Sequence, residues 1–357
     1  MVTPCIVFGV PVDGYTNAET LDRLGELVDD GRRRGRAHQV ATVNVDFLVN
    51  AVTDPTVLDL LQGAELNLAD GMPLVWASRL LGTPLPERVA GADLVPSLAR
   101  ASAERGWKVH LFGAGPGVAE RARAVMLTEH PDASITAEAG PERIDVERID
   151  DEVVQSIRAV APDVLCVALG NPKQERFIAT YRAVLGCPVM IGIGGSLDML
   201  VGDKERAPEW AQRAGVEWVF RAAQEPRRLG RRYLHDILIF GPRLLAYWRS
   251  VRRFRSADAL RLAVVGGTAT VTPSAVDTSW PDPWSGAEQD HPTSIDLQLS
   301  ASTALTPAAH ARLIGLVREA RMRGVAIRHR PIPPELQRCF EAFGTWEWLS
   351  TASTTTE

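Results

Sequence analysis

Short apolar runs alternate with amphipathic stretches from residue 5 to about residue 220. Runs of about five apolar residues are followed by helical patterns of ten or more, such as AETLDRLGELVDDGRRRG (18–35). This alternation predicts an α/β fold with a Rossmann-like, mostly parallel sheet and helices on both faces. The strand-like segments are CIVFGVPV (5–12), HQVATVNV (38–45), ELNLAD (65–70), KVHLFGAG (108–115), DVLCVALG (163–170) and PVMIGIGG (188–195).

The pattern changes twice towards the C-terminus. An Arg-rich helical stretch begins near residue 204, and a strand, helix, strand, helix pattern follows a Pro-, Ser- and Asp-rich segment. We therefore predict a Rossmann-like core, an Arg-rich appendage, a small α/β domain that contains a loop or linker, and a disordered tail. These parts span residues 1–203, 204–257, 258–350 (with the loop at 271–293) and 351–357.

Composition and charge exclude several classes of protein. The chain has 357 residues, is 45% hydrophobic and carries a net charge of −5, which fits two globular domains and argues against a nucleic-acid binder. The four cysteines form no C-x-x-C pair, so neither a disulfide scaffold nor a cysteine-built zinc site is expected. The N-terminus does not resemble a signal peptide, and no run of 18 apolar residues occurs. We expect a cytoplasmic protein that works on a membrane, if at all, from the surface.

Polar residues follow two of the predicted strands. Asp70 ends ELNLAD just before a helix, where a carboxylate can act as a general base or cap the helix. Thr42 and Asn44 are two apart in TVNVDF, so they project to the same side of the strand. They either donate to a ligand or cap the next helix. Asp46 competes for the capping role, which leaves Thr42 and Asn44 freer for a ligand.

Glycines mark three further strand ends. FGAGPG (112–117) has the spacing G-x-G-x-G, and it fits either a phosphate-binding loop or a plain strand-to-helix turn. ALGNPKQERF (168–177) and GIGGSLDML (192–200) add hydrogen-bonding side chains at two other strand ends. Together these loops indicate a phosphate-bearing ligand, although the P-loop pattern of nucleotide triphosphatases is absent. No His or carboxylate cluster has metal-ligand spacing, and no cofactor is expected.

The Arg-rich stretch is strongly basic and also apolar. Residues 221–255 contain ten Arg against Glu225 and Asp236, with Trp, Tyr, Phe and aliphatic residues interleaved. Guanidinium groups on phosphates with aromatic rings at the interface are typical of a peripheral protein on anionic lipid. A solvated helix face, or a clamp between domains, is the alternative interpretation.

Several segments together resemble the WecG/TagA/CpsF family of bacterial glycosyltransferases over about residues 5–250. The resemblance rests on TVNVDFLVNA, ADGMPLVWASRLLGTPLPERVAGADL, FGAGPGVAE, ALGNPKQERFI, GIGGSLDMLVGDKERAPEW and GVEWVFRAAQEPRRLGRRYL. It implies an inverting, metal-independent transferase that moves a sugar of the N-acetylmannosamine type from a UDP donor to a polyprenyl-diphosphate-linked sugar. Such an enzyme works at the inner membrane face in cell-surface polysaccharide assembly.

The resemblance also implies roles for single residues. Asp70 would be the catalytic base, and Arg88 would lie near the acceptor pocket. The other residues fall into two groups. The donor side would use Thr42, Asn44, Gly113, Gly115, Asn171, Gln174 and Asp198, and the acceptor diphosphate would meet Arg88, Arg221, Arg228 and Arg231.

The C-terminal region resembles a STAS domain, the fold of anti-sigma-factor antagonists. Thr306 and Pro307 stand where phosphorylation-switched members carry Asp and Ser, which does not match a phosphorylation switch. Such a domain implies a protein partner; a docking or dimerisation module is the alternative, and a homo-oligomer is left open.

For the whole chain, the competing interpretations are a non-catalytic scaffold and a Rossmann-type oxidoreductase. The missing dinucleotide fingerprint argues against the oxidoreductase.

Overall fold

The computed structural model groups the chain into two compact units, which we describe separately. The parallel-sheet unit contains residues 15–74 and 86–237, and the mixed-sheet unit contains residues 1–14, 75–85 and 238–357. The sequence predicts four consecutive parts, whereas the contacts place two N-terminal segments, 1–14 and 75–85, in the C-terminal unit. The structure describes residues 2–140, 145–146, 148–203, 207–208, 211, 217–224, 230–277, 280–285 and 288–352.

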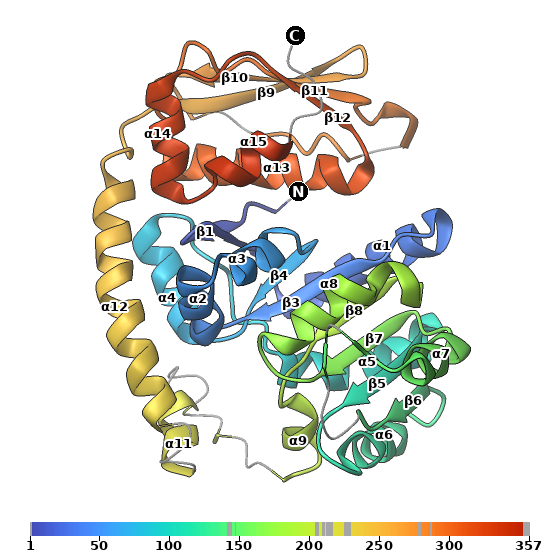
Figure 1. The fold of residues 1–357 in the computed structure, drawn as a ribbon. Helices are drawn as coiled ribbons and strands as arrows, with labels where there is room; N and C mark the ends of the chain where they lie inside the picture. The colour runs from blue at the N-terminus through green and yellow to red at the C-terminus, as the bar shows by residue number, and fades with distance from the viewer. Residues whose placement is uncertain are drawn as a thin grey trace. The chain divides into compact units, whose positions relative to one another are not determined.

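The parallel-sheet unit is built on six strands that all run in the same direction (Figure 1). Their order in the sheet is β4-β3-β8-β7-β5-β6. The strands are almost continuous apolar runs because both faces of the sheet are covered. The Rossmann-like fold with a parallel sheet is therefore confirmed. The strands are β3 (His38–Val43), β4 (Leu66–Ala69), β5 (Lys108–Gly113), β6 (Ser134–Glu138), β7 (Val164–Ala168) and β8 (Val189–Gly192).

Helices cover both faces of this sheet. Right-handed crossovers place α3, α7 and α8 on one face and α1, α5 and α6 on the other, in agreement with the packing of α7 on α8 and of α1 on α5. Thr16 and Glu19 form a capping box at the start of α1. The helices of the unit are α1 (Asn17–Arg34), α2 (Val45–Thr53), α3 (Pro55–Gln62), α5 (Gly91–Arg105), α6 (Val118–Glu129), α7 (Asp151–Val160), α8 (Lys173–Leu185), α9 (Ser196–Leu200) and α11 (Glu217–Gln224).

Two predictions of strands need correction. Residues 5–12 do not join the large sheet but form a two-stranded antiparallel hairpin, β1 (Cys5–Val7) and β2 (Val10–Val12). The turn is made by Phe8 and Gly9, which both have positive φ angles, and it reverses the chain at once. The sixth strand of the sheet is β6, which the sequence analysis missed because its residues alternate between buried and exposed at the sheet edge.

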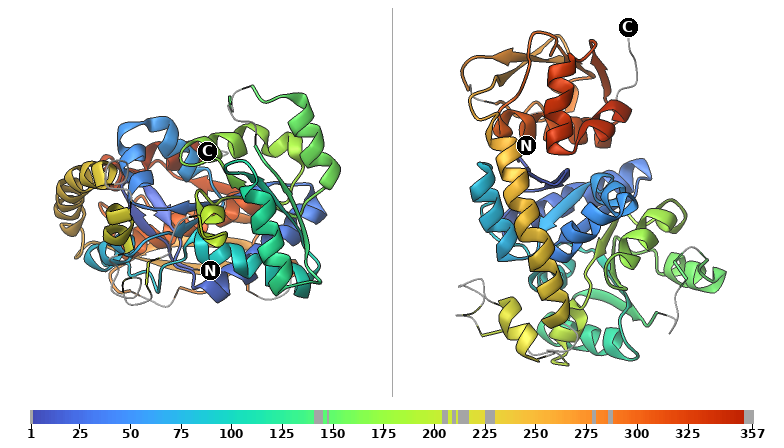
Figure 2. Two further views of the ribbon diagram at one scale, coloured as in Figure 1. Left: turned by 90° about the horizontal axis from the view of Figure 1, so that it is seen from below. Right: turned by 60° about the vertical axis from the view of Figure 1, so that its left-hand side comes forward.

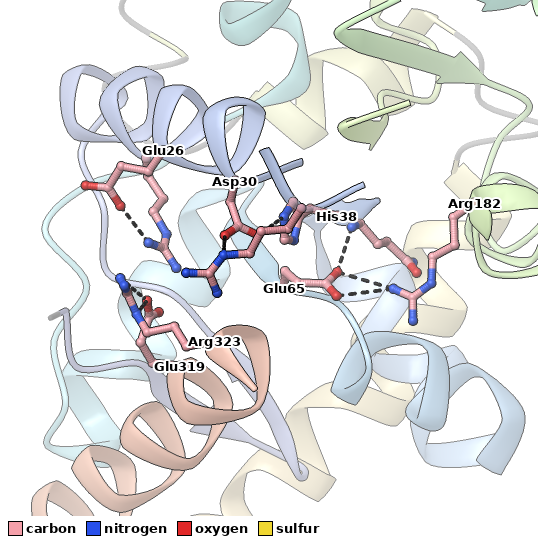
Figure 3. Close-up of polar contacts among 10 residues, drawn as sticks. Glu26, Asp30, His38, Glu65, Arg182, Glu319 and Arg323 are labelled. Carbon is pink, nitrogen blue, oxygen red and sulfur yellow. Dashed lines mark hydrogen bonds and ion pairs between the residues drawn. The ribbon is translucent and has the colours of Figure 1, made fainter. Parts of the chain in front are cut away.

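Ion pairs hold the amino-terminal ends of the strands, opposite the candidate site (Figure 3). His38, at the start of β3, lies 3.0 Å from an Asp30 oxygen. Burial lowers the pKa of His38 despite the nearby carboxylates of Glu65 and Asp30. The Glu65 carboxylate accepts a hydrogen bond from the Gln39 amide at 2.6 Å and contacts Arg182 at 3.2 Å. These contacts link α1, β3, the start of β4 and α8 at this edge, although the Nδ1 atom of His38 and the side-chain nitrogen of Gln39 are buried without a hydrogen-bond partner.

The mixed-sheet unit contains a four-stranded sheet of order β12-β11-β10-β9 (Figures 1 and 2). β9 and β10 are antiparallel, and the other two pairings are parallel. Helices gather on one face of this sheet, with α13 against β9 and β12. The strands are β9 (Ala259–Val265), β10 (Thr268–Ser274), β11 (Ser294–Leu297) and β12 (Ala326–His329); the helices are α13 (Pro307–Arg323), α14 (Pro334–Phe343), α15 (Trp346–Ala352) and the short η2 (Glu288–Asp290). Two further helices carry residues of both units: α4 (Met72–Leu81) and α12 (Arg231–Arg252).

The N-terminal hairpin is integrated into the mixed-sheet unit. The Arg318 guanidinium of α13 pairs with Asp13 at 2.8 Å, and both side chains are more than nine-tenths buried. The Tyr247 hydroxyl of α12 donates to the Ile6 carbonyl at 3.0 Å, and Phe8 packs edge-on against the Tyr247 ring. The first 14 residues therefore depend on side chains from the last third of the chain.

The predicted strand, helix, strand, helix order of the C-terminal region is present as β11, α13, β12 and α14. The predicted loop at 271–293 begins too early, because residues 271–274 belong to β10 and pair with β9, and Val271 also pairs with Leu297 of β11. The apolar run 259–271 is a hairpin that turns at Gly266 and Gly267. Thr306 caps α13 by accepting from the Ala309 amide, with Pro307 as the first helical residue. The likeness to a STAS domain stays a prediction.

Candidate functional site

The candidate site lies at the carboxyl ends of the parallel strands. β5 leads to β6 on one side, whereas β7 leads to β8 on the other, so the strand order reverses between β5 and β7. In open α/β sheets, ligands bind outside the carboxyl ends of the strands at such a reversal. The strand-end residues named in the sequence analysis lie at or just after the carboxyl ends of β3, β4, β5, β7 and β8, which form one edge of the sheet because all six strands are parallel.

Asp70 is held at the end of β4. Its amide donates to the Val43 carbonyl of β3 at 2.7 Å, and α4 begins two residues later at Met72. The Val89 amide donates to the Ala69 carbonyl at 2.9 Å, which brings the loop with Arg88 beside the same strand end. The backbone thus places a half-buried carboxylate and a guanidinium next to each other.

Three carboxylates surround Arg88. Its guanidinium is hydrogen-bonded to Glu217 of α11 and lies 3.1 Å from an Asp93 oxygen of α5. Burial on its own lowers the pKa of Arg88, but the charges of Glu217, Asp93 and Asp70 outweigh it and raise the pKa. Arg88 is therefore a permanent cation within electrostatic reach of Asp70.

Thr42 and Asn44 have structural partners in this structure. The buried Thr42 hydroxyl donates to the Gly192 carbonyl of β8 at 2.9 Å. Asn44 is the N-cap of α2, and its side-chain oxygen accepts from the Phe47 amide at 3.2 Å. The interpretation that Asp46 takes the capping role is wrong, because Asn44 precedes the first helical residue and Asp46 lies inside the first turn.

Asn171 and Gln174 tie neighbouring loops together. The Asn171 amide donates to Asp46 at 3.0 Å and so links the ends of β7 and β3. Gln174 is buried, and its side-chain oxygen accepts from the Gly170 amide at 3.2 Å and from the Gly194 amide at 2.9 Å. The Gln174 side chain therefore joins the loop after β7 to the loop after β8.

The two candidate glycines differ in what the backbone requires. Gly113 has a φ of 99°, and a Cβ there would lie 2.9 Å from the Ala168 carbonyl oxygen, so glycine is needed for the close approach of β5 and β7. A Cβ at Gly115 would meet only Val118, at an ordinary 3.6 Å. Sterics therefore demand glycine at position 113 but not at position 115.

Asp198 lies on α9 near the N-terminal part of α6. Its charge helps to raise the pKa of Arg121, whose largest contribution comes from a hydrogen bond to Asp203. The guanidinium contacts both Asp203 oxygens, so the segment that follows α9 is held against α6. Asp198 is thus on the same edge as the glycine loops but is associated with Arg121.

The structure describes only some of the arginines predicted to bind the diphosphate. Arg228 lies outside the described residues, and Arg221 lies in α11 without a described side chain. Arg231 begins α12 and is exposed. α12 also exposes large apolar side chains, including Leu234 at 59% and Leu238 at 65%. Its outer surface is thus basic and apolar at once.

Two acidic residues at the site were not among the predicted site residues. Glu217 was not singled out, although it is the first residue of α11 and the partner of Arg88. Asp236 is buried in α12, where burial and then the Asp46 carboxylate raise its pKa. The sequence offers one signal for both residues: Glu217 stands just before the Arg-rich stretch, and Asp236 is an acid inside it.

Within the ranges that the structure describes, no three His, Cys, Asp or Glu side chains gather in a way that could hold a metal ion. No helix formed by those residues is long and apolar enough to cross a membrane.

Comparisons with known proteins give one consistent result. The model of the family described as "Glycosyl transferase WecG/TagA/CpsF family" matches residues 5–254. Similar curated proteins are named N-acetylglucosaminyldiphosphoundecaprenol N-acetyl-beta-D-mannosaminyltransferase, from Staphylococcus aureus strains MW2, NCTC 8325 / PS 47 and COL. Each is 33% identical over 214 residues, which is 60% of this chain and 82% of the relative. The family match includes the loops of the candidate site and ends before β9.

Proposed function

The chain belongs to the WecG/TagA/CpsF family of glycosyl transferases, and from this premise we propose that it transfers a sugar of the N-acetylmannosamine type. The donor is the UDP-sugar, and the acceptor is a polyprenyl-diphosphate-linked sugar used in cell-surface polysaccharide synthesis. The acceptor class follows the names of the relatives, which act on N-acetylglucosaminyldiphosphoundecaprenol. The single observation that best supports the proposal is the Asp70 carboxylate at the end of β4 with the Arg88 cation beside it.

Asp70 is the general base in this proposal. It removes the proton from the acceptor hydroxyl while the oxygen attacks the anomeric carbon from the side opposite the leaving UDP. This single displacement inverts the anomeric centre. A carboxylate needs only to be ionised and within hydrogen-bond reach of the hydroxyl. The Arg88 guanidinium, whose pKa the Asp70 charge helps to raise, is the cation beside Asp70 in this proposal.

Basic groups and backbone amides neutralise the leaving diphosphate. Negative charge grows on UDP as the glycosidic bond breaks, and fixed donors stabilise it without reorganising. The donor loops are those of Gly113, Gly115, Asn171 and Gln174, with Thr42, Asn44 and Asp198 supporting them. Arg88, Arg221, Arg228 and Arg231 meet the acceptor diphosphate, and the surrounding Arg-rich segment rests on the anionic inner face of the cell membrane. A protein partner for the C-terminal region is part of the same proposal.

A transfer assay tests the proposal directly. Purified protein is incubated with a panel of UDP-sugars and a short-chain lipid-diphosphate-linked N-acetylglucosamine, and products are separated by mass and by anomeric configuration. Transfer from one UDP-sugar with inversion supports the proposal. Binding of UDP without transfer to any acceptor would instead favour a non-catalytic scaffold.

Transfer is expected to survive EDTA. Guanidinium groups and backbone amides stabilise the negative charge of the leaving diphosphate, which Mg²⁺ does in other transferases. Transfer rates measured with and without excess EDTA, at matched ionic strength, should agree within about twofold, because no step of the proposed mechanism depends on a Lewis acid. Complete loss in EDTA, restored by Mg²⁺ or Mn²⁺, would contradict metal independence.

Anionic vesicles are expected to bind α12. Arg243 and Arg249 are exposed on this helix, and each should contribute about 1 kcal/mol to binding. Replacing both with Gln should therefore weaken co-sedimentation by roughly 30-fold at low salt. Binding should also fade as salt is raised.

A matched pair of variants separates the membrane from the substrate. Replacing Arg228 and Arg231 with Gln should damage transfer more than vesicle binding, because a diphosphate clamp depends on position whereas a lipid surface responds to total charge. The comparison is with the variant in which Arg243 and Arg249 are replaced. If both double variants lose vesicle binding equally, and replacing Arg228 and Arg231 leaves transfer unaffected, then Arg228 and Arg231 do not bind the acceptor diphosphate. Deleting the whole segment is a poor alternative, because it also removes Tyr247, whose hydroxyl donates to the Ile6 carbonyl.

A further inference from the structure

Glu175 is a buried acid that none of the roles above uses. It is the third residue of α8, and only 1% of its surface is exposed. One carboxyl oxygen accepts a hydrogen bond from the Gln174 side-chain nitrogen at 2.8 Å. The other oxygen is buried and has no hydrogen-bond partner.

The hydrogen bond from Gln174 to Glu175 determines which way the Gln174 amide faces. With its nitrogen directed to Glu175, Gln174 presents its oxygen to the amides of Gly170 and Gly194. The reverse orientation would bring the nitrogen against two N–H donors and lose both bonds. Glu175 therefore acts on the two loops through Gln174.

The backbone of β8 leaves room for this pair of side chains. A Cβ at Gly192 would lie 2.5 Å from the Gln174 nitrogen and 2.5 Å from the Glu175 oxygen. Gly192 also offers its carbonyl to the Thr42 hydroxyl. Glycine at this position thus lets the end of β8 pack directly on the Gln174–Glu175 pair.

The surroundings favour the neutral form of Glu175. Burial raises its pKa to about 8, against hydrogen bonds from Gln174 and the Glu175 main chain that lower it. α8 packs against α3, α7, β3, β7 and β8. The titratable residues on those elements are Asp59, Asp151, Glu152, Arg158, His38 and Cys166, and Lys173 and Arg176 flank Glu175 on α8 itself. Burial, rather than a charge on one of these, is the main cause of the raised pKa.

The geometry points to Glu175 as a positioning residue: as a neutral acid it orients Gln174 and so holds the loops after β7 and β8 in the shape that receives the sugar-nucleotide. Ionisation would leave a buried charge on an oxygen that has no donor. The side chain would then move towards water, and the two loops would lose their common link. Glu175 acts through Gln174 and does not touch the reacting atoms. This role depends on the proposed function, because the loops are those assigned to the donor.

Two variants test the role. Glu175→Gln keeps an acceptor for Gln174 and is neutral at every pH, whereas Glu175→Met fills similar space without an acceptor. In the wild type, kcat/KM for the UDP-sugar should fall as pH rises through about 8. Glu175→Gln should lose this alkaline fall and stay within about threefold of wild type at pH 6.5, since it keeps the same hydrogen bond. Glu175→Met should raise KM for the donor by about tenfold at all pH values, since an unpaired buried Gln174 amide costs on the order of a hydrogen bond.

Stability supplies a readout that does not need activity. The pKa of Glu175 is higher in the folded protein than in the unfolded chain, so the wild type should lose stability relative to Glu175→Gln as pH rises from about 4.5 to 8. Above pH 8 the difference in Tm should stay constant. A Tm difference that does not change with pH would mean that Glu175 is not held neutral, and it would overturn the proposal.

The outcomes distinguish this role from the proposed function. An alkaline fall that persists in Glu175→Gln, or a wild-type donor KM in Glu175→Met, would overturn the role of Glu175 while transfer itself stands. If Glu175→Met fails to fold, the pH profile of Glu175→Gln decides. Absence of transfer and of UDP binding in the wild type would defeat the proposed function, whereas the Tm measurements would still report the protonation of Glu175.

Discussion

Asp70→Asn should lower turnover by on the order of 10²-fold or more, the loss expected when a general base is removed. The amide keeps the size and most hydrogen bonds of the carboxylate but cannot accept the proton of the acceptor hydroxyl. UDP affinity, measured by calorimetry, should stay nearly unchanged because Asp70 acts on the acceptor. Product formation under saturating substrates gives the turnover.

A matched control removes a carboxylate elsewhere in the same unit. Asp59 is exposed on α3, and Asp59→Asn should leave turnover within the error of the assay. A turnover within a few-fold of wild type in Asp70→Asn would exclude Asp70 as the base. A parallel loss of UDP affinity would mean that Asp70 supports the donor site instead.

Arg318→Met should destabilise the protein by about 3 kcal/mol or more, which is the usual cost of breaking a buried ion pair from one side. The methionine fills the space of the Arg318 stem but leaves the buried Asp13 carboxylate without its guanidinium partner. Urea unfolding, followed by the fluorescence of the tryptophans, measures the change in the free energy of unfolding.

Two further variants show whether the buried charge is the cause. Asp13→Asn combined with Arg318→Met removes both charges and should recover much of the lost stability. Arg312 lies on the same helix as Arg318 and pairs with the exposed Asp277. Arg312→Met breaks this exposed pair and should cost at most about 1 kcal/mol. Equal effects of Arg312→Met and Arg318→Met would contradict the importance of the buried pair.

Much of the parallel-sheet unit could be predicted from sequence because local signals agree with the fold. Buried parallel strands are apolar runs, and five of the predicted segments became strands of the sheet. The exceptions lack such a signal. Residues 5–12 are as apolar as a sheet strand, but the positive φ angles of Phe8 and Gly9 turn them into a hairpin. β6 lies at the sheet edge, where half-exposed residues hide the pattern.

The site was harder to predict because its contacts join distant residues. Arg88 and Glu217 are 129 positions apart, and no periodic pattern connects them. The competition between Asn44 and Asp46 for the cap depended on where α2 begins, and a shift of two residues reverses the answer. The segment 168–177 is recognisable in the sequence by its hydrogen-bonding side chains after a strand, but only the structure shows that Gly192 lies against Gln174 and Glu175.

The pairing of Asp13 with Arg318 has a consequence for how the protein is made. The two residues are 305 positions apart, and at about 5–20 residues per second a ribosome needs roughly 15–60 s to travel between them. During this time the N-terminal hairpin has been synthesised but its partners have not, and a two-stranded hairpin alone is at best marginally stable in water. The nascent chain therefore carries the apolar hairpin of residues 5–12 before the residues that pack against it have been synthesised. The buried contact of Asp13 can form only after the helix that carries Arg318 has been synthesised.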